Sequence, residues 1–150
     1  MRFRWKWKRC RYQEQQARHL GLELDDLRQS SLEAMSLVDE LQAVLGSDRV
    51  LAHPLERMVY DKDAGVTRGE VAAVVLPKTT QEVAACVRVA RTHGVPVVAR
   101  GAGTGLAGGA VPTEASLLVV LTRMNQIWEV DAEAKTAWVG PGVLNLDLTR

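Results

Sequence analysis

The sequence is poor in the residues and patterns that mark disulfide-bonded, metal-binding or membrane-embedded proteins. Only two of its 150 residues are cysteines, Cys10 and Cys86, and they form no C-x-x-C pair. A chain of this length buries a core without disulfides, so we expect one domain with a plain core thiol at Cys86, no metal site and a reducing, cytoplasmic location. No run of about eighteen apolar residues occurs, and no transmembrane segment is therefore expected.

Aromatic residues are also scarce, and four of the seven lie among the first twelve residues. The first eleven residues contain six bases and no acid, which leaves a net charge of −5 for the rest of the chain. This composition could bind an anionic membrane surface or nucleic acid. We favour a basic, polar tail over residues 1–29, disordered or a frayed helix, without nucleic-acid binding. A signal peptide is excluded because the segment lacks an apolar core.

Glycine, in contrast, is concentrated in one place. Residues 100–109 read RGAGTGLAGG and hold five of the twelve glycines of the chain. Glycine leaves the backbone open to a ligand and adopts positive φ, so that successive N–H groups can turn toward one anion. A phosphate or pyrophosphate is the natural ligand, and a tight corner is the alternative.

The chain before this run divides into a helix and an irregular segment. A capping box at Ser30 to Glu33, apolar residues at helical spacing and Gly46 as a C-terminal cap predict a helix over Ser31–Leu45. Residues 47–70 show turn chemistry and should wrap the surface. Their carboxylates Asp61, Asp63 and Glu70 are interpreted as solvated.

Regular structure is predicted on both sides of the glycine run. Residues 71–76 (VAAVVL) predict a strand buried on both faces. A capping box at Thr79 to Glu82 starts a helix that ends near His93 and Gly94, and residues 95–99 form a second strand. This unit predicts two parallel strands with a right-handed crossover. The glycine run then follows the carboxyl end of a strand, where ligands gather in open α/β sheets.

Shorter elements follow the glycine run. Residues 117–121 (LLVVL) predict a third buried strand, residues 127–130 and 136–139 a hairpin, and NLDLTR from Asn145 the start of a helix. The expected fold class is α+β, a small parallel or mixed sheet with flanking helices and a β-hairpin. Because the last helix has no C-terminal cap, we expect the sequence to be cut within an element.

Two common nucleotide-binding loops do not match this setting. Gly103, Gly105 and Gly108 have the G-x-G-x-x-G spacing of a Rossmann site, but residues 110–116 include Pro112 and leave no room for the helix that must face the pyrophosphate. Gly109 stands where a P-loop has its lysine. A glycine loop between two strands can still hold a pyrophosphate, with Thr104 as a further donor. Arg100 could serve either a phosphate or a structural acid.

Three motifs in this order are familiar: LPKTTQEV at residues 76–83, GVPVVARGAGTGLAGGAVP at 94–112 and PGVLNLDL at 141–148. The chain resembles FAD-linked oxidases of the vanillyl-alcohol oxidase type with a PCMH-type FAD-binding domain, above all glycolate oxidase D subunits and D-lactate dehydrogenases. The resemblance implies that residues 30–150 form the incomplete, amino-terminal part of that domain, its first subdomain.

The resemblance also implies the cofactor and its contacts. The glycine loop of such proteins binds the FAD pyrophosphate. Some members attach the flavin to a histidine that aligns with Thr104, and threonine cannot form this bond, so the FAD is expected to be non-covalent. His19, His53 and His93 lie outside the loop and are interpreted as surface or cap residues. The implied cofactor-binding positions are Pro77, Arg100, Gly101, Ala102, Gly103, Thr104, Gly105, Leu106, Gly108, Gly109, Pro141 and Gly142.

In the complete relatives, a 2-hydroxy acid such as glycolate or D-lactate is oxidised to the keto acid while FAD is reduced. The resemblance places the substrate-binding part after this chain, so no catalytic residue is assigned and the chain alone is expected to be inactive. Partner subunits of a glycolate-oxidase-type complex, and a cytoplasmic location with contact to the inner membrane face, are further expectations. A non-catalytic nucleotide-binding module and a basic-tailed interaction protein remain as alternatives.

Overall fold

The computed structural model describes residues 37–112 and 114–149. The predicted tail, residues 1–29, lies outside these residues, as do the capping box at Ser30 and the first part of the predicted helix Ser31–Leu45. The described end of that helix, residues 37–45, is helical. Gly46 has the predicted positive φ, 89°, but its ψ of 151° is extended, so it is not a left-handed helical cap.

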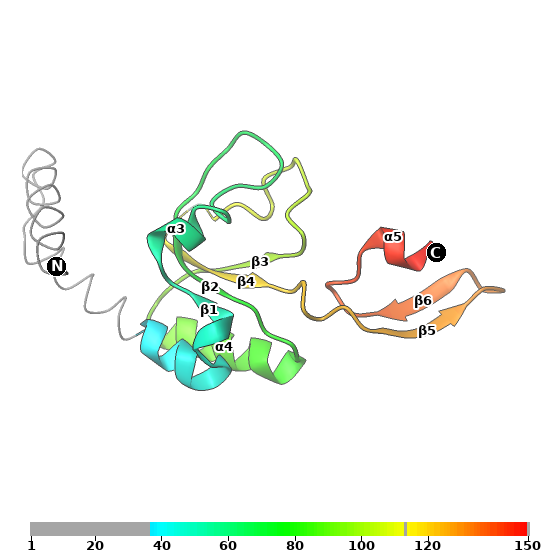
Figure 1. Ribbon diagram of the computed structural model, residues 1–150, viewed down its shortest axis with the longest axis horizontal. Helices are drawn as coiled ribbons and strands as arrows, with labels where there is room; N and C mark the ends of the chain where they lie inside the picture. Colours follow the sequence, from blue (N-terminus) through cyan, green and yellow to red (C-terminus); the bar gives the residue numbers. More distant parts are fainter. Residues whose placement is uncertain (1–36, 113, 150) are drawn as a thin grey trace, which may run out of the picture. The chain divides into compact units, whose positions relative to one another are not determined.

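Four strands form the main sheet, in the order β1 (Val50–Leu51), β2 (Val71–Val75), β4 (Ser116–Val120) and β3 (Val97–Arg100) (Figure 1). β4 pairs in parallel with β2 and with β3, whereas β1 is antiparallel to β2. The predicted pair of parallel strands is therefore confirmed, but β4 lies between them. The sheet is mixed and the fold is α+β.

The two central strands, β2 and β4, are buried on both faces, which explains why they read as continuous apolar runs, whereas Val97 of β3 is 40% exposed. One face packs against α4 (Thr80–Thr92) and helical residues 37–45, and on the other face Tyr60 packs against a second apolar cluster of Val71, Val74, Leu118 and Val120. Figure 1 shows the two helices on the same side of the sheet. The core on the helical side contains Leu37, Leu41, Leu45, Ala73, Val75, Cys86, Ala90, Leu117 and Val119.

α4 begins and ends as the sequence predicts. The Thr79 hydroxyl accepts a hydrogen bond from the Glu82 amide at 3.2 Å, and His93 is the C-terminal cap, followed by Gly94 with φ of 66°. Cys86 lies on the buried face of this helix with no exposed surface, and burial raises the pKa of its thiol to about 11. The prediction of a plain core thiol at Cys86 is confirmed.

Residues 47–70 are more ordered than predicted. They contain the short helix η1 (Ser47–Arg49), β1 and helix α3 (Pro54–Arg57). His53 caps α3 by accepting a hydrogen bond from the Leu55 amide at Nδ1, which confirms its interpretation as a cap. The Arg57 side chain ties α3 to the start of β2 by donating to the carbonyl oxygens of Val71 and Ala72.

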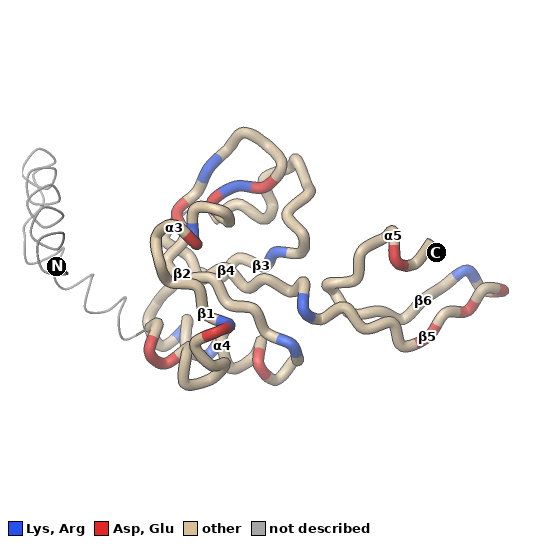
Figure 2. The backbone as a smooth tube through the Cα atoms, viewed as in Figure 1, with Lys and Arg blue, Asp and Glu red and all other residues tan. Residues whose placement is uncertain are grey.

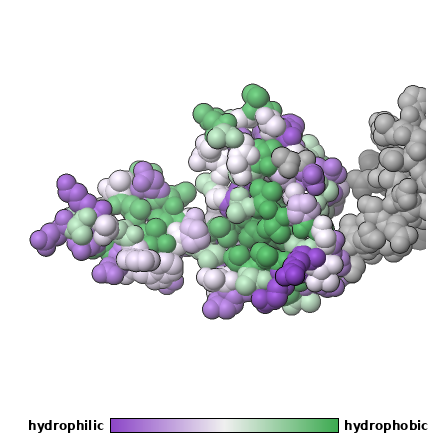
Figure 3. All heavy atoms as spheres, turned by 180° about the vertical axis from the view of Figure 1, so that it is seen from behind, coloured by the Kyte–Doolittle hydropathy of each residue, from purple (hydrophilic) through white to green (hydrophobic). Residues whose placement is uncertain are grey.

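The predicted hairpin is β5 (Ile127–Asp131) and β6 (Thr136–Val139), joined by a turn in which Lys135 has φ of 54°. A final turn of helix, α5 (Asn145–Leu148), follows. Every residue of β5 is exposed, and so are the leucines of α5. Figure 3 shows hydrophobic surface on this part of the chain beside the hydrophilic tip of the hairpin. No helix of the described residues could cross a membrane.

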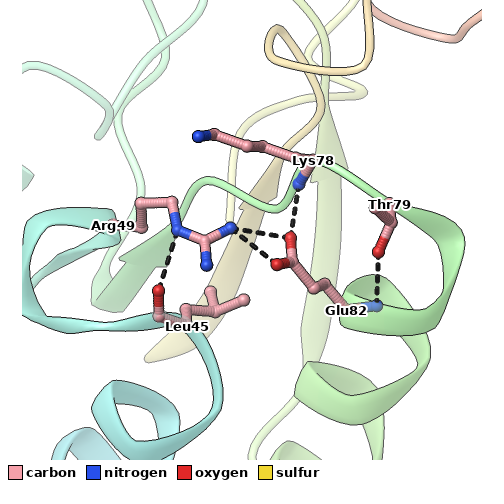
Figure 4. A network of polar contacts seen from close by, with 5 residues as sticks. All are labelled: Leu45, Arg49, Lys78, Thr79 and Glu82. Carbon is pink, nitrogen blue, oxygen red and sulfur yellow. Dashed lines mark hydrogen bonds and ion pairs between the residues drawn. The ribbon is translucent and has the colours of Figure 1, made fainter.

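One polar network joins three segments on the helical side of the sheet (Figure 4). The Arg49 guanidinium donates to both carboxylate oxygens of Glu82, at 2.8 and 2.7 Å, and to the Leu45 carbonyl. Glu82 also accepts from the Lys78 amide at 2.7 Å. Paired, charge-assisted bonds of this kind fix geometry as well as adding stability. The network therefore holds the start of α4 to the end of the helix at residues 37–45.

Glu82 should make the stability of the chain depend on pH. The bonds from Arg49 and from the Lys78 amide hold the pKa of Glu82 below its ordinary value of 4.5. The Glu82 carboxylate binds a proton less readily in the folded state than in the unfolded state. Its contribution to the unfolding free energy is therefore fully present above pH 4.5 and is lost as the pH falls through the folded pKa. Glu82→Gln should lower the unfolding free energy at neutral pH by about 1 kcal/mol.

Chemical denaturation between neutral pH and about pH 3 measures this dependence. Glu82→Gln should flatten the acid limb of the profile, whereas Glu133→Gln, in the exposed hairpin turn, should leave it unchanged. An acid limb that is the same in both variants would show that Glu82 does not contribute.

Candidate functional site

The predicted site residues gather at one edge of the sheet. β2, β4 and β3 are parallel, so their carboxyl ends share this edge. Pro77 follows β2, and residues 101–109, here called the glycine loop, follow β3. Pro141 and Gly142 reach the same edge through the end of β4, because the Gly142 amide donates to the Met124 carbonyl at 3.0 Å. The edge therefore collects the three predicted motifs.

The glycine loop does not need most of its glycines for its own fold. Only Gly103 and Gly108 have positive φ, 73° and 78°. A Cβ added at Gly101, Gly105 or Gly109 would meet no heavy atom within 4 Å. A tight corner would require glycine only where φ is positive or the backbone is crowded. Three glycines with ordinary φ and open space thus leave room beside the backbone for something other than the chain.

The backbone of the loop also has free donors. The N–H groups of residues 101–107 donate to no acceptor in the part of the chain that the structure describes. The loop contains no charged residue, as Figure 2 shows for the segment after β3. No helix occurs between β3 and β4 in residues 101–112 and 114–115, so the Rossmann arrangement is absent there. Amide groups are therefore the means by which this loop can hold an anion.

Arg100, the last residue of β3, is packed beneath the loop. Its side chain is buried, the residue being 8% exposed, and Nη1 donates to the Lys62 carbonyl at 2.8 Å. The guanidinium lies 5.6 Å from the centre of the Tyr60 ring. The structural acid expected as one of two partners of Arg100 is not observed among the described residues, where its partners are the Lys62 carbonyl oxygen and the Tyr60 ring.

Gly103 is needed because of this arginine. A Cβ at Gly103 would lie 2.1 Å from Nη2 and 2.3 Å from Cζ of Arg100. The guanidinium thus fills the space directly under the loop. Glycine is required at position 103 for two reasons, the positive φ of the residue and the close approach of the Arg100 guanidinium.

The interpretation of Asp63 as a solvated carboxylate is wrong. Asp63 is 6% exposed, and its two oxygens accept hydrogen bonds from the amides of Gly65, at 2.8 Å, and Gly108, at 2.9 Å. Asp61 pairs with Arg68 at 2.5 Å, and Glu70 is exposed as predicted. The spacing of Asp63 and Gly65 is that of a local Asx turn, but no local pattern indicates the contact with Gly108.

The remaining predicted positions differ in exposure. Thr104 is exposed and its hydroxyl has no partner among the described residues, whereas Leu106 is 77% exposed. Pro77 is fully buried. Gly142 is buried because its backbone crosses the end of β4, where an added Cβ would lie 2.1 Å from the Leu121 carbonyl oxygen. Pro77 and Gly142 therefore shape the edge, while the glycine loop is accessible.

Residues of the kind that ligate metals do not gather at this edge. Within the described ranges, no group of three His, Cys, Asp or Glu residues is arranged to hold an ion. His53 and His93 cap helices, and His19 lies outside the described residues. The chemistry available at the edge is thus hydrogen-bond donation from backbone amides and from Thr104.

Comparison with known proteins gives one family and many relatives. A family model described as an FAD binding domain matches residues 71–150. Glycolate oxidase subunit GlcD of Bacillus subtilis is 43% identical over 95 residues, which are 63% of this chain and 20% of that protein. D-lactate dehydrogenase of Archaeoglobus fulgidus is 35% identical over 112 residues, 73% of this chain and 24% of that protein. The chain thus spans about a fifth to a quarter of these relatives.

Solved structures agree with the sequence relatives. p-Cresol methylhydroxylase with substrate bound superposes with a TM-score of 0.70 at 27% identity, covering 78% of this chain and 24% of that one. A 4-ethylphenol oxidase from Gulosibacter chungangensis gives a TM-score of 0.66 at 31% identity over 74% of this chain. About three quarters of the chain thus recurs as about a quarter of each of these larger proteins.

Proposed function

Because the chain belongs to the FAD binding domain family, we propose that its glycine loop binds the pyrophosphate of FAD. The fold is the predicted one, part of a PCMH-type FAD-binding domain, and FAD is the cofactor of this family. One observation carries the proposal: three loop glycines have ordinary φ and open space around them. The fold does not require glycine at these positions, but a ligand lying against the backbone does.

The residues present fit a pyrophosphate. The N–H groups of residues 101–107 are free of partners in the described chain, and the Thr104 hydroxyl is exposed beside them. Gly108, Gly109, Ala102 and Leu106 belong to the same loop, and Pro77, Pro141 and Gly142 complete the edge. Arg100 is proposed to act from below, by supporting the loop at Gly103. Thr104 cannot bond covalently to a flavin, so we propose that the FAD is released by acid precipitation of the protein.

Gly105→Ala tests the proposal because it separates the ligand from the fold. An alanine methyl meets no atom of the chain at this position, so the thermal unfolding midpoint of the ligand-free chain should stay unchanged. In the bound state, the methyl group would stand between the backbone and the pyrophosphate. We therefore expect FAD affinity, measured by quenching of flavin fluorescence, to fall at least about tenfold.

Gly94→Ala is the matched control for the binding measurement. Gly94 lies at the end of α4 with open space around it and positive φ, so its replacement strains the backbone before β3, at the other end of that strand from the glycine loop. Its FAD affinity should equal that of the natural chain. Equal FAD affinity in Gly105→Ala and Gly94→Ala would contradict binding at the loop.

For the full-length protein we propose oxidation of a 2-hydroxy acid to the 2-keto acid, with bound FAD as the electron acceptor. Support comes from the relatives named for glycolate and D-lactate. The described residues contribute cofactor binding to this reaction, and we propose that substrate-binding residues and partner subunits of a glycolate-oxidase-type complex complete it. Anaerobic bleaching of the flavin by glycolate or D-lactate tests the substrate class, and failure of both acids would contradict it.

The exposed apolar residues after β4 agree with a role within a larger domain. Ile127, Val130 and Trp138 of the hairpin are 41%, 62% and 71% exposed, and Leu146 of α5 is 57% exposed. Exposed apolar surface of this kind marks sites where other protein packs. We propose that the rest of the FAD binding domain covers this surface in the full-length protein.

A further inference from the structure

Three consecutive residues contact the glycine loop and the arginine directly before it. The Lys62 carbonyl oxygen accepts from Arg100 Nη1 at 2.8 Å, at the end of β3. The Asp63 carboxylate accepts from the Gly108 amide at 2.9 Å, near its end. The Ala64 amide donates to the Gly105 carbonyl at 3.1 Å, in the middle. Residues 62–64 are therefore called the brace.

The contacts of the brace leave the donors of the loop free. They use a side chain at Arg100, a carbonyl oxygen at Gly105 and one amide at Gly108, and they use none of the N–H groups of residues 101–107. Figure 2 shows the brace in a segment of alternating acidic and basic residues, distinct from the uncharged loop. A ligand would thus meet a loop that is held from one side and open on the other.

Asp63 is the one brace residue that acts through its side chain. Lys62 and Ala64 contribute backbone atoms, which any residue supplies. The carboxylate is an acceptor only, and each of its oxygens has an amide donor, one in its own turn at Gly65 and one at Gly108. The contact also fixes the turn at the end of the loop, where the Val111 amide donates to the Gly108 carbonyl at 3.0 Å.

We propose that Asp63 is a positioning residue that holds the glycine loop in the shape that receives the FAD pyrophosphate. The inference rests on the proposed function of the loop and goes beyond it by assigning a role to a carboxylate outside the three motifs. A loop already fixed before binding loses less conformational entropy when the ligand arrives, so affinity depends on the brace.

Asp63→Asn changes this contact with little change in shape. Asparagine keeps one acceptor oxygen, but its NH₂ group would face one of the two amide donors, so one anchor is lost. In the ligand-free chain, hydrogen exchange at the amides of Gly108 and Ala64 should become about tenfold faster, while amides of β4 keep their protection. FAD and ADP, which share the pyrophosphate, should both bind about tenfold more weakly, and binding of riboflavin should not change.

Asp61→Asn is the control, because it removes the same charge two residues away. The Asp61 carboxylate accepts from Arg68 and, among the described residues, accepts no hydrogen bond from the loop. Its exchange rates in the loop and its affinity for FAD should match those of the natural chain. A purely electrostatic effect of the charge would alter both variants alike, and that result would overturn the positioning role.

The outcomes separate this inference from the function on which it rests. If the natural chain binds neither FAD nor ADP, the proposed function fails, and the exchange rates still decide whether Asp63 holds the loop. If the natural chain binds FAD and Asp63→Asn binds it within about a factor of two, the inference is overturned. If Asp63→Asn unfolds, hydrogen exchange of the natural chain tests the inference instead. The Gly108 amide, which donates to Asp63, should exchange more slowly than the Leu106 amide, and equal rates would overturn the inference.

Discussion

Gly69→Ala is expected to destabilise the chain by about 2–4 kcal/mol, a loss that removes much of the stability of a domain of this size. An added Cβ would lie 1.6 Å from the carbonyl oxygen of Pro112 and 2.7 Å from its carbonyl carbon. These are backbone atoms, so no side chain can turn aside. The Glu70 amide donates to the same Pro112 oxygen at 3.2 Å, and the two segments would have to separate.

Urea denaturation of the ligand-free chain, followed by circular dichroism, measures this effect. Gly109→Ala is the matched control, because its added Cβ meets no atom and the unfolding midpoint should hardly move. The separation would also disturb the brace, which precedes Gly69 by a few residues. Gly69→Ala should therefore lose FAD binding together with stability, and a midpoint equal to that of Gly109→Ala would refute the close approach to Pro112.

Gly103→Ala is expected to weaken FAD binding about a hundredfold. Positive φ costs a residue with a Cβ about 1 kcal/mol, and the methyl group would collide with the Arg100 guanidinium. Arginine side chains are flexible, but this one is buried against Tyr60 and bonded to the Lys62 carbonyl. If the side chain moved, its hydrogen bond to Lys62 would break, at a cost of about 1.5–3 kcal/mol. If it stayed, the backbone at residue 103 would have to move away, and in both cases the loop is displaced.

Gly108→Ala separates the backbone strain of a positive φ from the collision with Arg100. Gly108 has a similar φ, 78°, but open space where the Cβ would stand. In Gly108→Ala, only the backbone strain should weaken binding. The FAD affinity, measured in the same fluorescence titration, should fall about tenfold or less. If Gly103→Ala and Gly108→Ala lost equal affinity, the contact between Arg100 and the loop would have no part in binding.

The strands and helices near the glycine loop could be predicted because their signals are local. Continuous apolar runs marked β2 and β4, and the Thr79 cap with His93 and Gly94 bounded α4 to within a residue. The absence of a helix after the loop followed from the seven residues, 110–116, that precede the predicted strand at 117–121. Each of these features depends on neighbours in sequence, which periodicity and capping chemistry report.

The order of the strands and the environment of Asp63 could not be predicted in this way. β4 inserts between β2 and β3, although an apolar run carries no information about its partners. Asp63 and Gly108 are 45 positions apart, and their contact forms only because residues 61–70 return alongside the segment after β3. The local sequence does not distinguish Asp63 from Asp61, because both are carboxylates in the same polar segment.

The glycines show most clearly what the sequence determined and what the tertiary structure determined. The sequence by itself determined that residues 101–109 form an anion-binding loop candidate at the end of a strand, and its motifs indicated FAD. Only the tertiary structure showed which glycines the fold needs: Gly69, Gly103 and Gly142 leave space for other parts of the chain, whereas Gly101, Gly105 and Gly109 have open space around them, which we propose a ligand uses. The physical reason is that local sequence sets φ preferences and backbone accessibility, while close approach depends on segments brought together by folding.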